Sequence, residues 1–145
     1  MEQRISLITL GVADLRRARS FYEQLGWRGH EMEETVFFQA GGQAVILWSR
    51  EKLAADAGID DDGTNTFAGI ALAHNVASRD EVDRVIGAAA TAGAQVTRRA
   101  AETFYGGYAG YFRDPDGHVW EVAHNPGFTL NDDGTLTLPD FSAAP

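Results

Sequence analysis

The order of apolar and polar residues predicts the first group of elements. Residues 5–12 form an apolar run rich in β-branched side chains, which is typical of a strand. In residues 14–26, apolar side chains recur at helical spacing, with Asp14 placed to cap the helix and Gly26 placed to end it. Three shorter strands are expected at residues 27–32, 34–39 and 43–48. This half of the chain therefore predicts the order βαβββ.

The second half repeats that order. Residues 67–76 are apolar and strand-like, Ser78 can cap a helix, and Gly93 can end it. Three further strands are expected at residues 95–98, 108–112 and 118–123. A unit repeated after about 65 to 75 residues indicates duplication of a module that cannot bury its sheet face alone. We therefore predict an α+β fold in which two βαβββ modules form a curved mixed sheet around a cleft.

We expect a single domain of 145 residues with four parts. The first module covers residues 1–48 and the second covers residues 67–125. Between them, residues 49–66 form a linker in which residues 51–57 favour a short helix. The C-terminal tail, residues 126–145, is expected to pack on a sheet edge or on a partner.

Charge and composition limit the kinds of partner and site that the chain is expected to have. The formal net charge of −9 argues against nucleic acid or an anionic membrane as a partner, and it suits a small neutral or cationic ligand. The chain has no Cys, which excludes disulfides, thiolate zinc sites and a Cys nucleophile. No apolar run approaches the roughly 18 residues of a membrane span, and the first four residues lack a signal-peptide pattern. We therefore expect a cytoplasmic protein.

One carboxylate stands inside an apolar strand near the C-terminus. The preceding residues 114–117 have the sequence Asp-Pro-Asp-Gly, in which Asp114 can bond the backbone two residues on and Gly117 tolerates a left-handed conformation. In the strand after this turn, alternation places Trp120 towards the helices and Glu121 on the opposite face. A buried carboxylate is costly without a partner, so Glu121 points to a cavity.

Several short motifs occur in a fixed order. They are Val12-Ala13-Asp14-Leu15, Phe21-Tyr22, Leu25-Gly26, Ala92-Gly93-Ala94, and Asp114-Pro115-Asp116-Gly117-His118 leading to Trp120-Glu121. Together they resemble the vicinal oxygen chelate superfamily, which includes glyoxalase I, extradiol dioxygenases, fosfomycin-resistance enzymes and bleomycin-resistance proteins. The resemblance covers almost the whole chain, and it is strongest with bacterial glyoxalase-like proteins. It implies the two-module fold predicted above.

Metal-dependent members of that superfamily hold a divalent ion with His, Gln or Glu side chains on the first and last strands of each module. The matching positions here are Leu7, Ile46 (or Leu47 after a one-residue shift), Ala71 and Glu121. Only Glu121 can bind a metal, whereas a catalytic ion needs about three protein ligands. The nearby His74, His118 and His124 are expected to face away from the cleft. We therefore predict no metal and no other cofactor, with a metal-dependent lyase, isomerase or dioxygenase as the alternative.

The remaining cleft is predicted to be apolar and aromatic, as small-molecule sites usually are. Its expected ligand-binding residues are Leu7, Thr9, Phe37, Ile46, Trp48, Ala71, Tyr105, Tyr108, Tyr111 and Glu121. The resemblance to fosfomycin-resistance enzymes implies the role of Tyr111, and the glycine-flanked loop around Tyr105 can close over a planar ligand. The alternative is that these aromatic side chains are core residues.

The predicted function is the binding of a small aromatic or cationic organic molecule, and the resemblance to bleomycin-resistance proteins implies sequestration. Glu121 would accept a hydrogen bond from the ligand, or act as a catalytic base if burial raises its pKa. Its structural alternative is a pair with a buried Arg or a bond to the backbone. A partner-binding module with a vestigial pocket is a third hypothesis. Because many relatives dimerise, we expect a homodimer, with the Trp120 face and residues 128–141 as candidate contacts.

Overall fold

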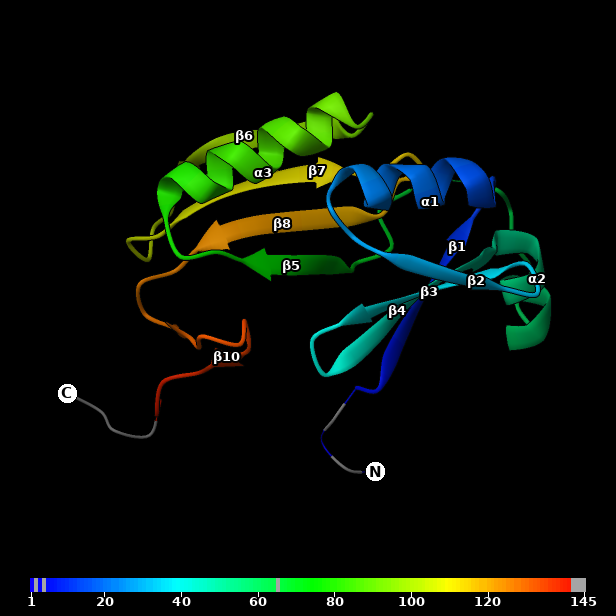
Figure 1. Cartoon of the computed structure of the whole chain (residues 1–145), viewed down its shortest axis with the longest axis horizontal. Helices are drawn as coiled ribbons and strands as arrows, with labels where there is room; N and C mark the ends of the chain where they lie inside the picture. Colours follow the sequence, from blue (N-terminus) through cyan, green and yellow to red (C-terminus); the bar gives the residue numbers. More distant parts are fainter. Residues whose placement is uncertain (2, 4, 65, 142–145) are drawn as a thin grey trace.

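The computed structural model describes residues 1, 3, 5–64 and 66–141, and it contains two modules with the same order of elements (Figure 1). The first module comprises β1 (Leu7–Val12), α1 (Leu15–Gln24), β2 (Gly29–Met32), β3 (Thr35–Ala40) and β4 (Gln43–Ser49). The second comprises β5 (Ala71–Asn75), α3 (Arg79–Thr91), β6 (Gln95–Glu102), β7 (Tyr108–Arg113) and β8 (Val119–His124). The linker holds α2 (Arg50–Ala57), and the tail holds β9 (Thr129–Leu130) and β10 (Leu136–Thr137). Residue 65 of the predicted linker and residues 142–145 of the predicted tail lie outside the described residues.

Each module forms its own mixed sheet. The strand orders are β1-β4-β3-β2 and β5-β8-β7-β6, and in both sheets the first and last strands of the module pair in parallel. The helices α1 and α3 each cover one face of their own module's sheet (Figure 1). The predicted α+β fold of two βαβββ modules is therefore confirmed. The eight strands remain in two four-stranded sheets and do not close into a barrel.

Local capping chemistry sets the helix ends as the sequence indicates. The Asp14 carboxylate accepts the Arg17 N–H at 2.9 Å, and the Ser78 hydroxyl accepts the Glu81 N–H at 3.2 Å. Gly26 follows α1 with a φ of 93°, a left-handed conformation that a side chain would strain. None of the helices in the described part of the chain is long and apolar enough to cross a membrane.

Two strand boundaries differ from the prediction by four residues, and the other boundaries differ by no more than two. The strand expected from residue 67 begins only at Ala71, and the preceding Phe67 and Ile70 are 64% and 66% exposed. The strand expected to end at residue 98 continues to Glu102 as β6, with two register shifts against β7. An apolar run does not by itself reveal whether a neighbouring strand is present to pair with it.

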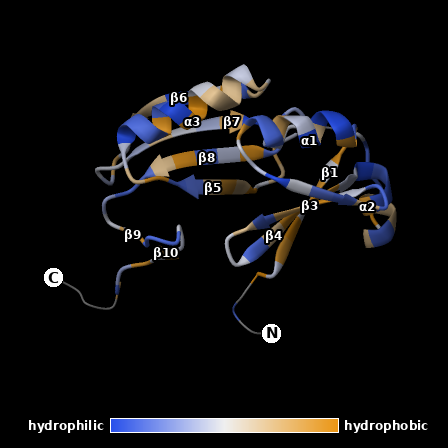
Figure 2. Cartoon of the chain, viewed as in Figure 1, coloured by the Kyte–Doolittle hydropathy of each residue, from blue (hydrophilic) through white to orange (hydrophobic). Residues whose placement is uncertain are grey.

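A common core joins the two modules. Figure 2 shows hydrophobic residues along β1 and β4, whereas α1 and α3 also carry hydrophilic residues. One cluster of buried apolar side chains runs from the helix face of the first sheet to that of the second. At its centre, Tyr22 of α1 lies against Trp27, Phe38 and Trp120, with ring centroids 5.3 to 6.2 Å apart. Burial of these aromatic rings stabilises the contact between the modules.

The turn between β7 and β8 adds polar contacts across the module boundary. Asp114 Oδ1 accepts the Asp116 N–H at 2.9 Å, which confirms the predicted turn chemistry. The other oxygen, Asp114 Oδ2, accepts the Tyr22 hydroxyl at 2.6 Å and contacts His118 Nδ1 at 2.7 Å. The Trp120 indole N–H in turn donates to the Tyr22 oxygen at 3.2 Å. Trp120 is only 8% exposed and packs within the chain, which leaves little of it for the predicted dimer contact.

Candidate functional site

Side-chain alternation along β8 separates two environments. Trp120 and Val122 are buried in the core under the helices, as expected for Trp120. Glu121 is partly buried on the opposite face of the sheet. On that face it lies between Ala73 of β5 and Tyr111 of β7, its direct neighbours across the strands. The structure thus places Glu121 and Tyr111 together, as the turn between their strands requires.

Three polar side chains meet on this face, and we call Glu121, Tyr111 and Arg98 the Glu121 cluster. Burial, and then a hydrogen bond and the charge of Glu121, raise the pKa of Tyr111, so its hydroxyl stays protonated. The Arg98 guanidinium lies 4.7 Å from the centre of the Tyr111 ring, and its Nη2 donates to the Ala109 carbonyl at 3.2 Å. Glu121 is therefore an acceptor that lies beside Tyr111 and has lone pairs for a ligand.

The structure brings the five predicted residues of the first module to one face. Thr9, Ile46 and Phe37 form a row across β1, β4 and β3. Leu7 and Trp48 lie two residues away from members of this row, so alternation puts them on the same face. Ile46 is buried, whereas Leu7 is 50% exposed. Of these five residues, only Thr9, with its hydroxyl, and Trp48, with its indole N–H, carry a polar side-chain group.

The predicted residues of the second module divide between the two faces. Ala71 shares the Glu121 face, two residues before Ala73 on β5. Tyr105, in the loop after β6, lies near enough to Tyr111 to affect its ionisation. Tyr108 lies apart, because its hydroxyl donates to Asp83 of α3 at 3.0 Å. The loop ends at residue 107, so Tyr108 is already a strand residue and, three positions from Tyr111, faces the other way.

A cavity of about 220 Å³ lies between β1, residues 66–70 and the start of β8, and we call it the junction cavity. Its walls include Thr9 and Val119, which face the same sides of their sheets as Ile46 and Glu121. Asp116 also lines it, with a side chain only 5% exposed. Asp116 Oδ1 accepts the Ala13 N–H and an Arg17 N–H, both at 2.9 Å. Asp116 Oδ2 is buried and has no partner among the described residues.

The residues present do not fit a divalent metal ion. Leu7, Ile46 and Ala71 carry only hydrocarbon side chains, which leaves Glu121 as the one donor of the four matching positions. The described residues contain no group of three or more His, Cys, Asp or Glu that could hold a metal. His118 contacts Asp114, and His124 contacts the Val76 carbonyl at 3.3 Å.

Two polar residues of these sites were absent from the sequence-based prediction of the site. Arg98 reaches Tyr111 only because a register shift precedes it in β6, and bulges leave little trace in a sequence. Asp116 was assigned to the turn alone, but its carboxylate reaches the first module across 103 positions of sequence. A second acidic residue in a turn that needs only one side-chain acceptor was the available signal.

Comparison with known proteins supports the same fold. A glyoxalase-related enzyme from Fulvimarina pelagi is 37% identical, with a TM-score of 0.87 over 94% of this chain and 99% of that one. A hypothetical protein from S. aureus is 25% identical, with a TM-score of 0.75 over 86% and 94% of the two chains. A fosfomycin resistance protein from Mesorhizobium loti, at 21% identity and a TM-score of 0.64 over 86% and 94%, shares the fold. Curated protein sequences gave no match.

The family model described as Glyoxalase/Bleomycin resistance protein/Dioxygenase superfamily matches residues 4–122, which include both modules up to β8. The resemblance inferred from the motifs is therefore confirmed. The chain belongs to the glyoxalase, bleomycin-resistance and dioxygenase superfamily.

Proposed function

We propose that this protein binds a small aromatic and cationic organic molecule, with the ring in the junction cavity and the cationic group at Asp116. The observation that carries the proposal is the buried Asp116 Oδ2, which has no partner in the described part of the chain and belongs to a residue that lines the cavity. A buried carboxylate oxygen without a partner costs free energy, and a ligand N–H would remove that cost.

The size and lining of the junction cavity suit one aromatic ring. An apolar cavity of about 150 Å³ can hold benzene, so about 220 Å³ leaves room for a ring and a short side chain. Phe67 and Ile70 contribute apolar surface to the walls. Arg50 also lines the cavity, but its guanidinium already makes two hydrogen bonds with Asp61, at 2.7 and 2.8 Å.

Glu121 extends this site along β8. It lies two residues beyond Val119 on the same face, which is roughly 7 Å along a strand. The Glu121 cluster can therefore accept a second polar group of a longer ligand. We include in the proposal a sequestering role and a homodimer, which the superfamily resemblance implies, and a cytoplasmic location, which the sequence pattern predicts.

The direct test is a thermal-shift titration with phenethylamine and its neutral analogue 2-phenylethanol. Saturation to 100 times the Kd stabilises the folded state by about 2.7 kcal/mol, which for a chain of this size raises the Tm by roughly 5 to 11 °C. We expect phenethylamine to raise the Tm and 2-phenylethanol to have a much smaller effect. An equal response to both compounds, or to neither, would contradict the proposal.

Substitutions locate the site. Asp116→Asn should abolish the preference for the amine, whereas Asp132→Asn, the same change on the exposed tail, should leave it intact. Because Asp116→Asn also weakens the contact with Arg17, the variant must first be shown to be folded by circular dichroism. Ala68→Phe offers an independent test, since Ala68 lines the cavity at an exposed position and the larger side chain should exclude the ring.

Elemental analysis of protein purified without chelator tests the metal-dependent alternative. Near-stoichiometric Ni, Zn, Fe or Mn that disappears in Glu121→Ala would replace the binding proposal with a metal-dependent enzyme. Without such metal, the binding function stands on the phenethylamine titration.

A further inference from the structure

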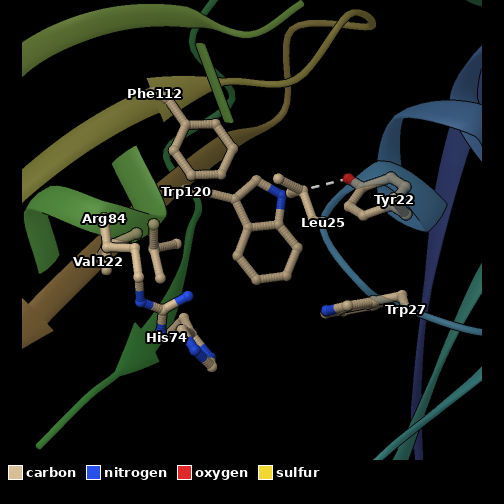
Figure 3. A pocket seen from close by; sticks show the side chains of 9 residues that line it. Tyr22, Leu25, Trp27, His74, Arg84, Phe112, Trp120 and Val122 are labelled. Atoms are coloured by element: carbon tan, nitrogen blue, oxygen red, sulfur yellow. Dashed lines mark hydrogen bonds between the residues drawn. The ribbon is translucent and has the colours of Figure 1, made fainter. Parts of the chain in front are cut away.

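A second cavity of about 220 Å³ lies on the helix side of the sheets, where the two modules meet (Figure 3). We call it the helix-side pocket. The first module contributes Tyr22, Leu25 and Trp27, and the second contributes His74, Arg84 and Trp120, among others. It faces away from Glu121, because Trp120 and Glu121 are adjacent in β8 and point to opposite faces. The helix-side pocket is therefore separate from the site proposed above.

Aromatic rings form much of the wall of the helix-side pocket. Trp27 and Trp120 meet edge to face with ring centroids 5.8 Å apart, and Phe112 stacks on Trp120 at 6.4 Å. Such rings favour a flat aromatic guest, which they contact through faces and edges. The hydrogen bond between Trp120 and Tyr22 holds the indole in place, as the dashed line in Figure 3 shows. The part of the wall formed by Trp120 is thus fixed in orientation before a ligand arrives.

The Arg84 guanidinium and the His74 imidazole lie together on one side of the pocket (Figure 3). Arg84 extends from α3 and has no carboxylate partner within the described residues, and His74 extends from β5. Glu81 is the acidic residue whose charge favours protonation of His74, but its carboxylate already accepts the Ala77 N–H at 2.8 Å. Both Arg84 and His74 are open to solvent, so an anion can reach them.

His74 adds a hydrogen bond rather than a second charge. Partial burial, together with the positive charge of Arg84, lowers the pKa of His74, and the charge of Glu81 opposes this only in part. The imidazole is therefore neutral near pH 7 and can donate one hydrogen bond. An Arg guanidinium with no competing carboxylate is well matched to a planar, bidentate acceptor.

We propose that the helix-side pocket binds a small aromatic carboxylate, with the ring against Trp27 and Trp120 and the carboxylate on the Arg84 guanidinium, next to His74. In a chain with a net charge of −9, an Arg that has no carboxylate partner among the described residues and lies beside an aromatic pocket gives this anion one favourable site. The ligand has the opposite charge to the one expected in the junction cavity, so the two proposals can be tested separately.

The test is an NMR titration of the full chain with phenylacetate, followed at the three tryptophan indole N–H resonances. Trp27 and Trp120 line the pocket and should shift, whereas Trp48, on the other face of the first sheet, should not. For a ligand of about ten heavy atoms we expect a Kd on the order of 1 mM. Phenylacetamide, which has the same shape without the charge, should bind about tenfold more weakly or worse.

A matched pair of variants assigns the anion to Arg84. Arg84→Gln removes the charge at an exposed helix position and should weaken phenylacetate binding about tenfold or more, with little effect on phenylacetamide. Arg99→Gln makes the same change on exposed β6, away from the pocket, and should leave the Kd unchanged. Equal affinity for the acid and the amide, no effect of Arg84→Gln, or shifts confined to Trp48 would each overturn the proposal.

Discussion

Removal of one buried hydroxyl tests how the two modules are held together. Tyr22 is 1% exposed, and its hydroxyl donates to Asp114 of the second module while accepting from the Trp120 indole. Tyr22→Phe deletes both contacts and keeps the ring. The substitution lowers the stability of the fold because the site is buried, so water cannot replace the lost hydroxyl as a partner of Asp114 or Trp120.

The magnitude can be worked out from the two lost bonds. A hydrogen bond to a charged acceptor contributes about 2 kcal/mol, and a buried indole N–H left without an acceptor costs about 1 kcal/mol. Tyr22→Phe should therefore lower the free energy of unfolding by about 3 kcal/mol, a large part of the total stability of a typical domain. The corresponding fall in Tm is roughly 6 to 12 °C.

Urea denaturation followed by tryptophan fluorescence measures this change. Tyr108→Phe is the matched control, since it removes the same hydroxyl from an exposed contact with Asp83, for which we expect less than about 1 kcal/mol. The m-value should stay constant if both variants unfold in one step. A cost for Tyr22→Phe no larger than that for Tyr108→Phe would refute the assigned role of the hydroxyl.

Three further predictions concern pH and packing. Burial alone would raise the pKa of Asp114, but the contacts with His118 and Tyr22 outweigh it and hold the pKa below the usual value. The stabilising effect of Asp114 is therefore present above about pH 4 and is lost as the pH falls through the folded-state pKa. The Tm measured at decreasing pH should fall in this range. A Tm that stays constant there would contradict the assigned role of Asp114. Gly29→Ala should cost about 1–3 kcal/mol by urea denaturation, since the new Cβ would lie 2.8 Å from the buried Phe38 ring, and an unchanged midpoint would exclude this clash. Gly87→Ala places its new methyl group in open space on α3, so it should raise the free energy of unfolding by about 0.5–1 kcal/mol. A lower Tm would show that the position is too crowded for the methyl group.

Local chemistry made much of the fold predictable from sequence. Asp14, Ser78 and Gly26 act within a few residues of their own helix ends, so their roles could be recognised without knowledge of the tertiary structure. The start of β5 was not predictable in this way. Phe67 and Ile70 are apolar and strand-like, but none of the strands in the described part of the chain pairs with them, and they stay exposed.

The candidate sites depend more on distant contacts. The position of Glu121 opposite Trp120 followed from the turn and from alternation along one strand. The junction cavity also needs Asp116, whose partners lie in the other module, and no local rule connects residues so far apart. The helix-side pocket likewise needs Trp27 and Arg84 to meet across the module boundary. Sequence patterns identified the faces of single strands but not the spaces between modules.

The contacts between the β7–β8 turn and α1 also bear on how the chain folds as it is synthesised. The partners of Ala13 and Tyr22 lie 103 and 92 residues later in the sequence. A ribosome therefore releases the whole first module before Asp114 and Asp116 exist to complete its buried polar contacts. Contacts of such large sequence separation slow folding, and an unfinished first module exposes apolar surface in the meantime. We therefore expect the nascent first module to be prone to aggregation and to bind chaperones.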